Sequence, residues 1–135
     1  MIITICGSST FVKQMETTAA HLKAKGFEVF TPEPLVTEEW YKENYSREKL
    51  LEMKPIWTKD HFNRIQNSDA VLILNSEKKG IKGYLGSNTL MELSVAFFLD
   101  KKIFLLNNFD EKHPHFEELI GIKSIILNGD LDKIK

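Results

Sequence analysis

The sequence has a single cysteine, almost no net charge and no long apolar run. Because Cys6 is the only cysteine among 135 residues, no intrachain disulfide can form, and a reducing cytosol is expected. A membrane-spanning helix needs about 20 consecutive apolar residues, which the sequence lacks. The N-terminal residues also show no basic segment or cleavage site of a secretory signal. We therefore expect a cytoplasmic protein that does not act on a membrane.

The charge balance argues against a polyanionic partner. Lysine and arginine number 18, and aspartate and glutamate number 19, so no excess of positive charge could follow a nucleic-acid backbone. A small-molecule ligand is favoured, and binding to nucleic acid is not expected. His113 and His115 stand close together, but without a further ligand pattern they make a poor metal set. We expect no metal and no cofactor.

Short apolar runs alternate with helical patterns along the chain. The runs predicted as strands are residues 1–6, 27–30, 69–75, 102–107 and 124–127. Helices are predicted from about residue 12 up to Gly26, across residues 38–67, after residue 89 and at residues 116–120. Within the second of these, Pro55 predicts a break or kink. Four side chains of that helix are expected to face the core: Trp57, His61, Phe62 and Ile65.

This alternation predicts an α/β fold. Strands that alternate with helices form a parallel sheet through right-handed crossovers, with helices on both faces. We predict a doubly wound three-layer sandwich, Rossmann-like or flavodoxin-like, with a parallel sheet of about five strands, formed by residues 1–135 as one domain. Ligands of such sheets bind beyond the carboxyl ends of the strands, so the loops there are the candidate site.

Two of these loops combine backbone donors with small hydroxyl-bearing side chains. They follow the strands at 1–6 and 69–75 and lie near helix starts, where partial positive charge favours an anion or a sugar. Neither is a P-loop or a dinucleotide fingerprint, and their polar residues are also typical helix caps. Lys78, Lys79 and Lys82 are either a solvated loop face or a means of attracting phosphate. The candidate substrate-binding residues are Cys6, Gly7, Ser8, Ser9, Tyr84, Gly86, Ser87, Asn88 and Thr89.

Glu92 is the candidate catalytic residue. It precedes the apolar stretch 93–99, and a carboxylate at the entrance of a buried helix needs a partner or a task. With Thr89 it has the spacing of a capping box, which would make its role structural. The functional interpretation is a nucleophile or charge stabiliser at a sugar anomeric carbon, where the transition state is oxocarbenium-like.

Three segments resemble the nucleoside 2-deoxyribosyltransferase superfamily, including its deoxynucleoside monophosphate N-glycosidase-like members. They are Cys6-Gly7-Ser8, Asp60 with residues 63–69, and residues 86–96. The resemblance implies that Glu92 attacks the anomeric carbon of a 2′-deoxynucleoside, releases the base and leaves a deoxyribosyl-enzyme. Transfer to another base, or hydrolysis by water, would follow. It also implies a nucleoside or nucleotide substrate and a homo-oligomer.

The resemblance assigns further roles. Asp60 lies near the family's acidic residue that binds the base or assists its protonation, and a shift of one residue would bring His61 there. Gly86 stands where the family commonly has an aspartate. The related N-glycosidases have a serine at that position and bind phosphate through serines. Ser87, together with Ser8 and Ser9, therefore favours a nucleotide substrate.

Two alternatives stay open. Thr89 and Glu92 also resemble the Gly-Gly-x-Gly-Thr-x-x-Glu signature of the lysine-decarboxylase-like phosphoribohydrolases, although the paired glycines are missing. The other alternative is a non-catalytic Rossmann-like sensor that binds a nucleotide with the same loops. Gly86, in place of the aspartate, is the feature that favours it.

Overall fold

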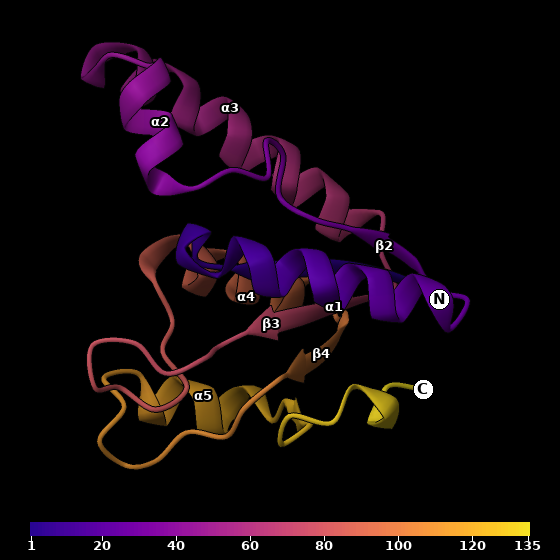
Figure 1. Cartoon of the computed structure of the whole chain (residues 1–135). Helices are drawn as coiled ribbons and strands as arrows, with labels where there is room; N and C mark the ends of the chain where they lie inside the picture. Colours follow the sequence, from indigo (N-terminus) through magenta and orange to yellow (C-terminus); the bar gives the residue numbers. More distant parts are fainter.

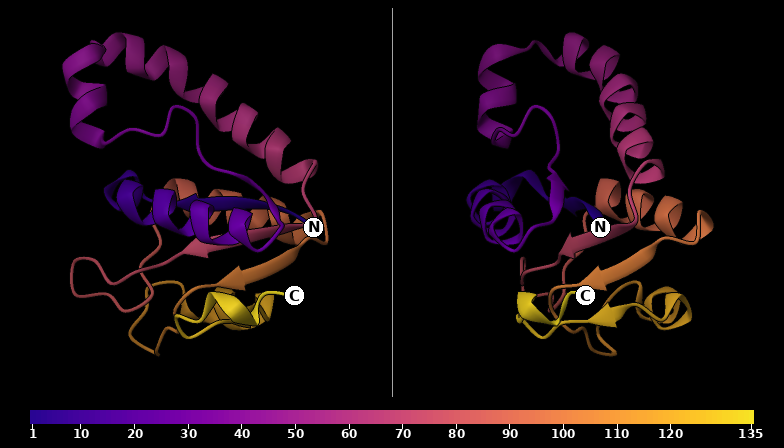
Figure 2. Two further views of the ribbon diagram at one scale, coloured as in Figure 1. Left: turned by 45° about the vertical axis from the view of Figure 1, so that its right-hand side comes forward. Right: turned by 90° about the vertical axis from the view of Figure 1, so that its right-hand side faces the viewer.

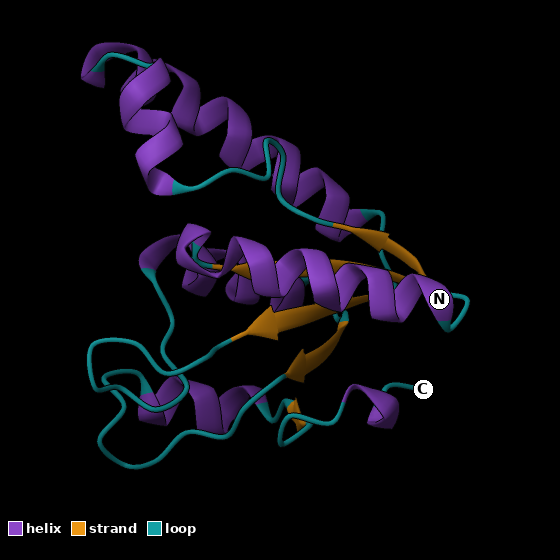
Figure 3. Ribbon diagram, in the orientation of Figure 1, coloured by secondary structure: helices purple, strands orange, loops and turns teal.

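The computed structural model describes residues 1–135 and has a five-stranded parallel sheet at its centre. The strands are β1 (Ile2–Gly7), β2 (Glu28–Phe30), β3 (Ala70–Leu74), β4 (Lys102–Leu105) and β5 (Ile125–Ile126). They are ordered β2-β1-β3-β4-β5, and every pairing is parallel. This confirms the predicted fold class, and each strand overlaps the run predicted for it. Figure 3 shows the sheet among the helices.

Five α-helices connect the strands. They are α1 (Val12–Ala24), α2 (Glu38–Asn44), α3 (Arg47–Gln66), α4 (Ser87–Phe98) and α5 (Phe116–Ile122), with short 3₁₀ helices at Ser9–Phe11 and Leu131–Lys133. In Figures 1 and 2, α2 and the first half of α3 project away from the sheet, whereas α1 and α4 lie against it. None of the helices combines the length and the apolar character needed to cross a membrane.

The alternation of side chains along the strands gives the sheet two separate cores. Ile3 and Leu72 belong to one cluster, in which Met15 and Leu22 of α1 cover the sheet. Successive strand residues point to opposite faces, so the neighbouring positions enter the other cluster. There the strands pack against three helices through Ile65 of α3, Leu93 and Ala96 of α4, and Leu119 of α5. This two-sided burial is the three-layer sandwich that was predicted.

Pro55 was predicted to break or kink the long helical stretch, but the break lies elsewhere. The chain leaves the helix at Tyr45, and the Ser46 hydroxyl accepts a hydrogen bond from the amide of Lys49 to start α3. Pro55 lies inside α3 without ending it. A proline leaves the carbonyl four residues earlier without its donor. That residue is Leu51, which is exposed, so solvent can satisfy the carbonyl.

Four aromatic rings fix α2 on α3. Trp40 contacts Tyr41 and Tyr45, and Trp57 contacts the same two tyrosines, with ring centroids 5.1–6.0 Å apart. The rings form a small cluster that holds the projecting helices together, and Tyr41 and Trp57 of this cluster also line the cleft described below.

The order of the strands creates a switch point between β1 and β3. From β1 the chain places β2 on one side and β3 on the other, so the loops that follow β1 and β3 diverge to opposite faces. Gly7, the last residue of β1, is opposite Leu74, the last residue of β3. A Cβ at Gly7 would lie 3.0 Å from Met15 Cε and 3.3 Å from the Leu74 carbonyl oxygen, so the packing at this edge is close.

His113 holds the loop that leads into α4. Its Nε2 donates to the carbonyl of Gly83 at 2.9 Å, and its Nδ1 accepts from the amide of His115 at 3.0 Å. Both ring nitrogens are therefore used by the neutral form. Burial is the main cause that lowers the pKa of His113 below its usual value of 6.5. Protonation of the ring would remove the acceptor for His115.

We expect His113→Phe to lower the free energy of unfolding by about 1–3 kcal/mol near pH 7.5, because the Gly83 carbonyl loses its donor. Since the folded-state pKa lies below the unfolded value, the contribution of His113 is complete above about pH 6.5 and is lost as the pH falls toward the folded-state pKa. Urea unfolding near pH 7.5 and again in acid measures the free energy of unfolding of wild type and His113→Phe. The two values should differ less in acid than near pH 7.5. His115→Phe is the matched control. If wild type and His113→Phe differed equally in the free energy of unfolding at both pH values, the role given to neutral His113 would be contradicted.

Candidate active site

A cleft of about 610 Å³ lies at the switch point of the sheet. Six segments line it: the loop after β1, the start of α1, the loop after β2, α2, one face of α3 and the start of α4. A shallower groove of about 340 Å³ between α3 and α4 has no titratable side chain in its lining. The cleft is therefore the place where chemistry can occur.

Glu92 is the sixth residue of α4 and lines the cleft. The helix begins at Ser87 with Gly86 as its N-cap, and no side chain caps it. The capping-box interpretation of Thr89 and Glu92 is therefore wrong, because the helix starts three residues earlier than the pattern suggested. Glu92 lies in the second turn, where its carboxylate has no role at the helix end.

His61 is the partner of Glu92. Its Nε2 lies 2.8 Å from Glu92 Oε2, and the two side chains are only 10% and 12% exposed. Burying a carboxylate is costly unless an opposite charge or hydrogen bonds compensate it, and an imidazolium can do so. No hydrogen bond of good geometry reaches Glu92 Oε2, although His61 is at ion-pair distance. Glu92 Oε2 is thus almost completely buried, and His61 is its polar neighbour.

Cys6 lies beneath this pair. Its Sγ is 3.5 Å from His61 Nε2, and the residue is completely buried. Burial, together with the negative charge of Glu92 and a hydrogen bond to it, raises the pKa of the Cys6 thiol well above its usual value. The thiol stays protonated, which excludes it as a nucleophile because the thiolate is the reactive form.

These three side chains are also the only group in the structure that could hold a metal ion. Their ligand atoms lie within 4.8 Å of one another. A metal would need the thiolate of Cys6, whose surroundings favour the thiol, and it would replace the contact of His61 with Glu92. The donor set is better suited to a hydrogen-bonded cluster.

Seven of the nine predicted substrate-binding residues line the cleft with Glu92. They are Gly7, Ser8 and Ser9 after β1, and Gly86, Ser87, Asn88 and Thr89 at the start of α4. The Ser8 hydroxyl accepts from the amide of Thr10 and caps the 3₁₀ helix, so this loop combines a capping role with a place in the cleft. Cys6 is buried below the cleft, and Tyr84 is outside its lining but beside it, since the Tyr84 hydroxyl lies 3.8 Å from a Cβ built at Gly86.

Asp60 was the second predicted catalytic residue, and the structure places it elsewhere. It is exposed and does not line the cleft. His61, the next residue, points into the cleft because α3 turns a different face to it. At this turn of α3 the residue that lines the cleft is therefore His61 and not Asp60.

The contribution of α3 was the main feature that sequence reasoning missed. Its lining residues are Arg47, Leu50, Leu51, Lys54, Trp57, Thr58 and His61. They are spaced by three or four residues, apart from adjacent pairs, as expected for one face of a helix. Trp57 and His61 were both expected to face inward, and the same helical spacing continued toward Arg47 would have predicted this face.

The strand order defines a flavodoxin-like, doubly wound α/β protein, and its cleft lies at the switch point. Two solved structures share this fold. A 2-deoxyribosyltransferase from Bacillus psychrosaccharolyticus, described as a biocatalyst for nucleoside synthesis, matches 78% of this chain and 71% of its own at a TM-score of 0.53. The CMP N-glycosidase BcmB from Clostridium botulinum matches 95% and 89%, also at 0.53.

Each of these two structures is 17% identical to the chain in sequence. No protein-family model and no curated protein matches the sequence. The likeness establishes the fold.

The environment of Cys6 predicts low thiol reactivity. In the folded protein we expect a thiol reagent to label Cys6 far more slowly than in guanidinium at about pH 8, because the group is buried and protonated. Mass spectrometry of the labelled protein over time measures both rates. Labelling of the folded protein as fast as that of the unfolded chain would contradict the buried position.

Proposed function

We propose that the protein is an enzyme that cleaves or transfers at the N-glycosidic bond of a nucleoside or nucleotide, with Glu92 as the nucleophile. The observation that carries this proposal is a largely buried carboxylate that opens onto a cleft lined by hydroxyl and amide side chains. Both structural neighbours are named for reactions of this kind, on a deoxyribosyl group and on CMP. The fold and the cleft therefore support the same reaction class.

In the first step, Glu92 attacks C1′ of the sugar. A bond forms between its oxygen and C1′, the C1′–N bond breaks, and the electron pair moves to the nitrogen of the base. The negative carboxylate stabilises the positive charge that develops on the sugar in the transition state. Ser8, Ser87 and Asn88 bind the sugar or its phosphate.

His61 is the proton carrier in this proposal. As an imidazolium it neutralises Glu92 before the reaction, and it gives its proton to the leaving base when the carboxylate is consumed by the new bond. In the second step a water or an acceptor base attacks C1′, releases Glu92 and returns a proton to His61. Cys6 remains protonated and holds His61 in position.

A non-catalytic nucleotide sensor is the second candidate. Gly86 favours it, because it lacks the side chain that the resemblance expects at this position, and the atom nearest to a Cβ built there is the Tyr84 hydroxyl at 3.8 Å. Such a protein would bind a nucleotide in the same cleft without releasing the base.

Substitutions of Glu92, His61 and Asp60 distinguish the enzyme from the sensor. We expect Glu92→Gln to lower the rate of base release by a factor of about 1,000 or more. His61→Asn should lower kcat by about 100- to 10,000-fold, which is the range of general acid catalysis. Asp60→Asn is the matched control and should leave the rate unchanged, since that side chain is exposed outside the cleft.

The measurement is base release from the common ribo- and deoxyribonucleosides and their 5′-monophosphates, with and without an acceptor base, followed by chromatography. Circular dichroism shows whether each variant is folded. Full activity in folded Glu92→Gln would refute the assignment of the nucleophile. Tight binding of a nucleotide by wild type without any base release would favour the sensor.

A further inference from the structure

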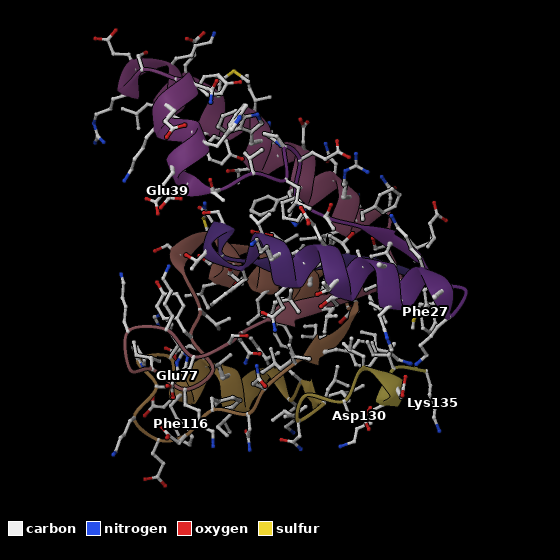
Figure 4. All side chains as sticks on the ribbon, in the orientation of Figure 1. Phe27, Glu39, Glu77, Phe116, Asp130 and Lys135 are labelled. Carbon is white, nitrogen blue, oxygen red and sulfur yellow. The ribbon has the colours of Figure 1, made fainter.

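The loop after β3 brings an ammonium group to the edge of the cleft. Lys78 Nζ lies 2.8 Å from Thr10 Oγ1 and 3.3 Å from Ser8 Oγ, and Ser8 lines the cleft next to the end of β1. Lys78 is half-buried, whereas its neighbour Lys79 is exposed. Figure 4 labels Glu77, the preceding residue, on the same loop. A lysine held by two hydroxyl groups has lost most of its side-chain freedom, so its charge has a defined position.

No carboxylate pairs with Lys78. The six ion pairs of the structure involve other residues, and Glu77 is in none of them. The acidic side chains of the cleft already have partners: Glu33 pairs with Arg64, Glu38 with Lys42 and Glu92 with His61. The charge of Lys78 is therefore uncompensated in a partly desolvated place, where attraction to an anion is stronger than in bulk water.

The hydrogen bonds around Lys78 leave donors free. An ammonium group has three N–H donors, and Lys78 uses two of them on Ser8 and Thr10. Thr10 Oγ1 accepts from Lys78 and from the Ser8 hydroxyl, so its own hydrogen is unused. One N–H and one O–H thus remain for a ligand that accepts hydrogen bonds and carries negative charge. A phosphate oxygen is such an acceptor.

The backbone sets this arrangement. Lys78 and Ile81 exchange two backbone hydrogen bonds of 3.3 and 2.9 Å across a tight turn, in which Lys79 and Gly80 have positive φ. The hydroxyl of Ser76 donates to Gln14 Oε1 at 2.9 Å, which ties the loop to α1. Lys78 is therefore directed at the loop after β1 before any ligand binds.

We propose that Lys78, together with Thr10, binds a phosphate group on the sugar of the substrate and so selects a nucleoside 5′-monophosphate over the unphosphorylated nucleoside. This rests on the proposed function, because it assumes that Glu92 meets the anomeric carbon of the same sugar. Ser8 lines the same cleft as Glu92 and also contacts Lys78, so it joins the Lys78 group to the cleft.

The test compares Lys78→Met with Lys79→Met. Both variants remove one charge from the same loop, and both ammonium groups lie near the Tyr84 ring, at 5.3 and 5.9 Å, but only Lys78 contacts Ser8 and Thr10. The readout is the ratio of kcat/KM for a nucleoside 5′-monophosphate to kcat/KM for its nucleoside. Loss of a charged hydrogen bond should lower this ratio about 10- to 100-fold in Lys78→Met. Lys79→Met should keep the wild-type ratio.

A ratio that Lys78→Met leaves unchanged, or one that Lys79→Met lowers equally, would overturn the proposal. So would a wild type that does not prefer the monophosphate. If no compound releases its base, the proposed function fails. The role of Lys78 is then tested separately, by calorimetric measurement of the affinity of Glu92→Gln for the monophosphate and for the nucleoside. If Glu92→Gln binds the monophosphate more tightly than the nucleoside, and the double variant with Lys78→Met does not, the phosphate site would still be supported. Equal binding of the two compounds would refute it.

Discussion

The contact between His61 and Glu92 is the interaction on which the site depends. A carboxylate that is only 12% exposed needs a compensating charge, and His61 provides the one ion pair within reach at 2.8 Å. The pair joins α3 to α4, while Cys6 brings the end of β1 to within 3.5 Å of the same ring. Elements that are distant in sequence thus meet at this pair, at the edge where the parallel strands end.

The contact between His61 and Glu92 keeps a mostly buried carboxylate in the wall of the cleft. The pair is buried enough to be strong, yet one oxygen of Glu92 has no hydrogen bond of good geometry. A residue whose polar atoms were all satisfied would have little affinity for an electrophilic carbon. The projecting helices α2 and α3 contribute to this environment, because their aromatic cluster supports the wall of the cleft that carries Trp57 and His61. The fold therefore places a partly desolvated carboxylate in the wall of the cleft.

The sequence predicted the fold well because strands buried on both faces are continuous apolar runs, and those of β3 and β4 are unmistakable. It also predicted that the loops after β1 and β3 would line one site, since the order of strands and helices determines where loops meet. It could not locate the start of α4, because Thr89 and Glu92 imitate a capping box although the helix begins at Ser87. Asp60 failed as a candidate because one residue along α3 rotates a side chain by about 100°. Neither the pairing of His61 with Glu92 nor that of Lys78 with Ser8 has a local sequence signal.

Direct trapping of the sugar on Glu92 tests the central claim. A substrate analogue with fluorine at C2′ destabilises the oxocarbenium-like transition states and slows release of a covalent intermediate. After incubation with such an analogue, peptide mass spectrometry should find the sugar attached to the peptide that contains Glu92, with one base released per modified chain. A protein that turns over the natural substrate but carries the sugar on another residue, or forms no adduct while the analogue occupies the cleft, would contradict the account.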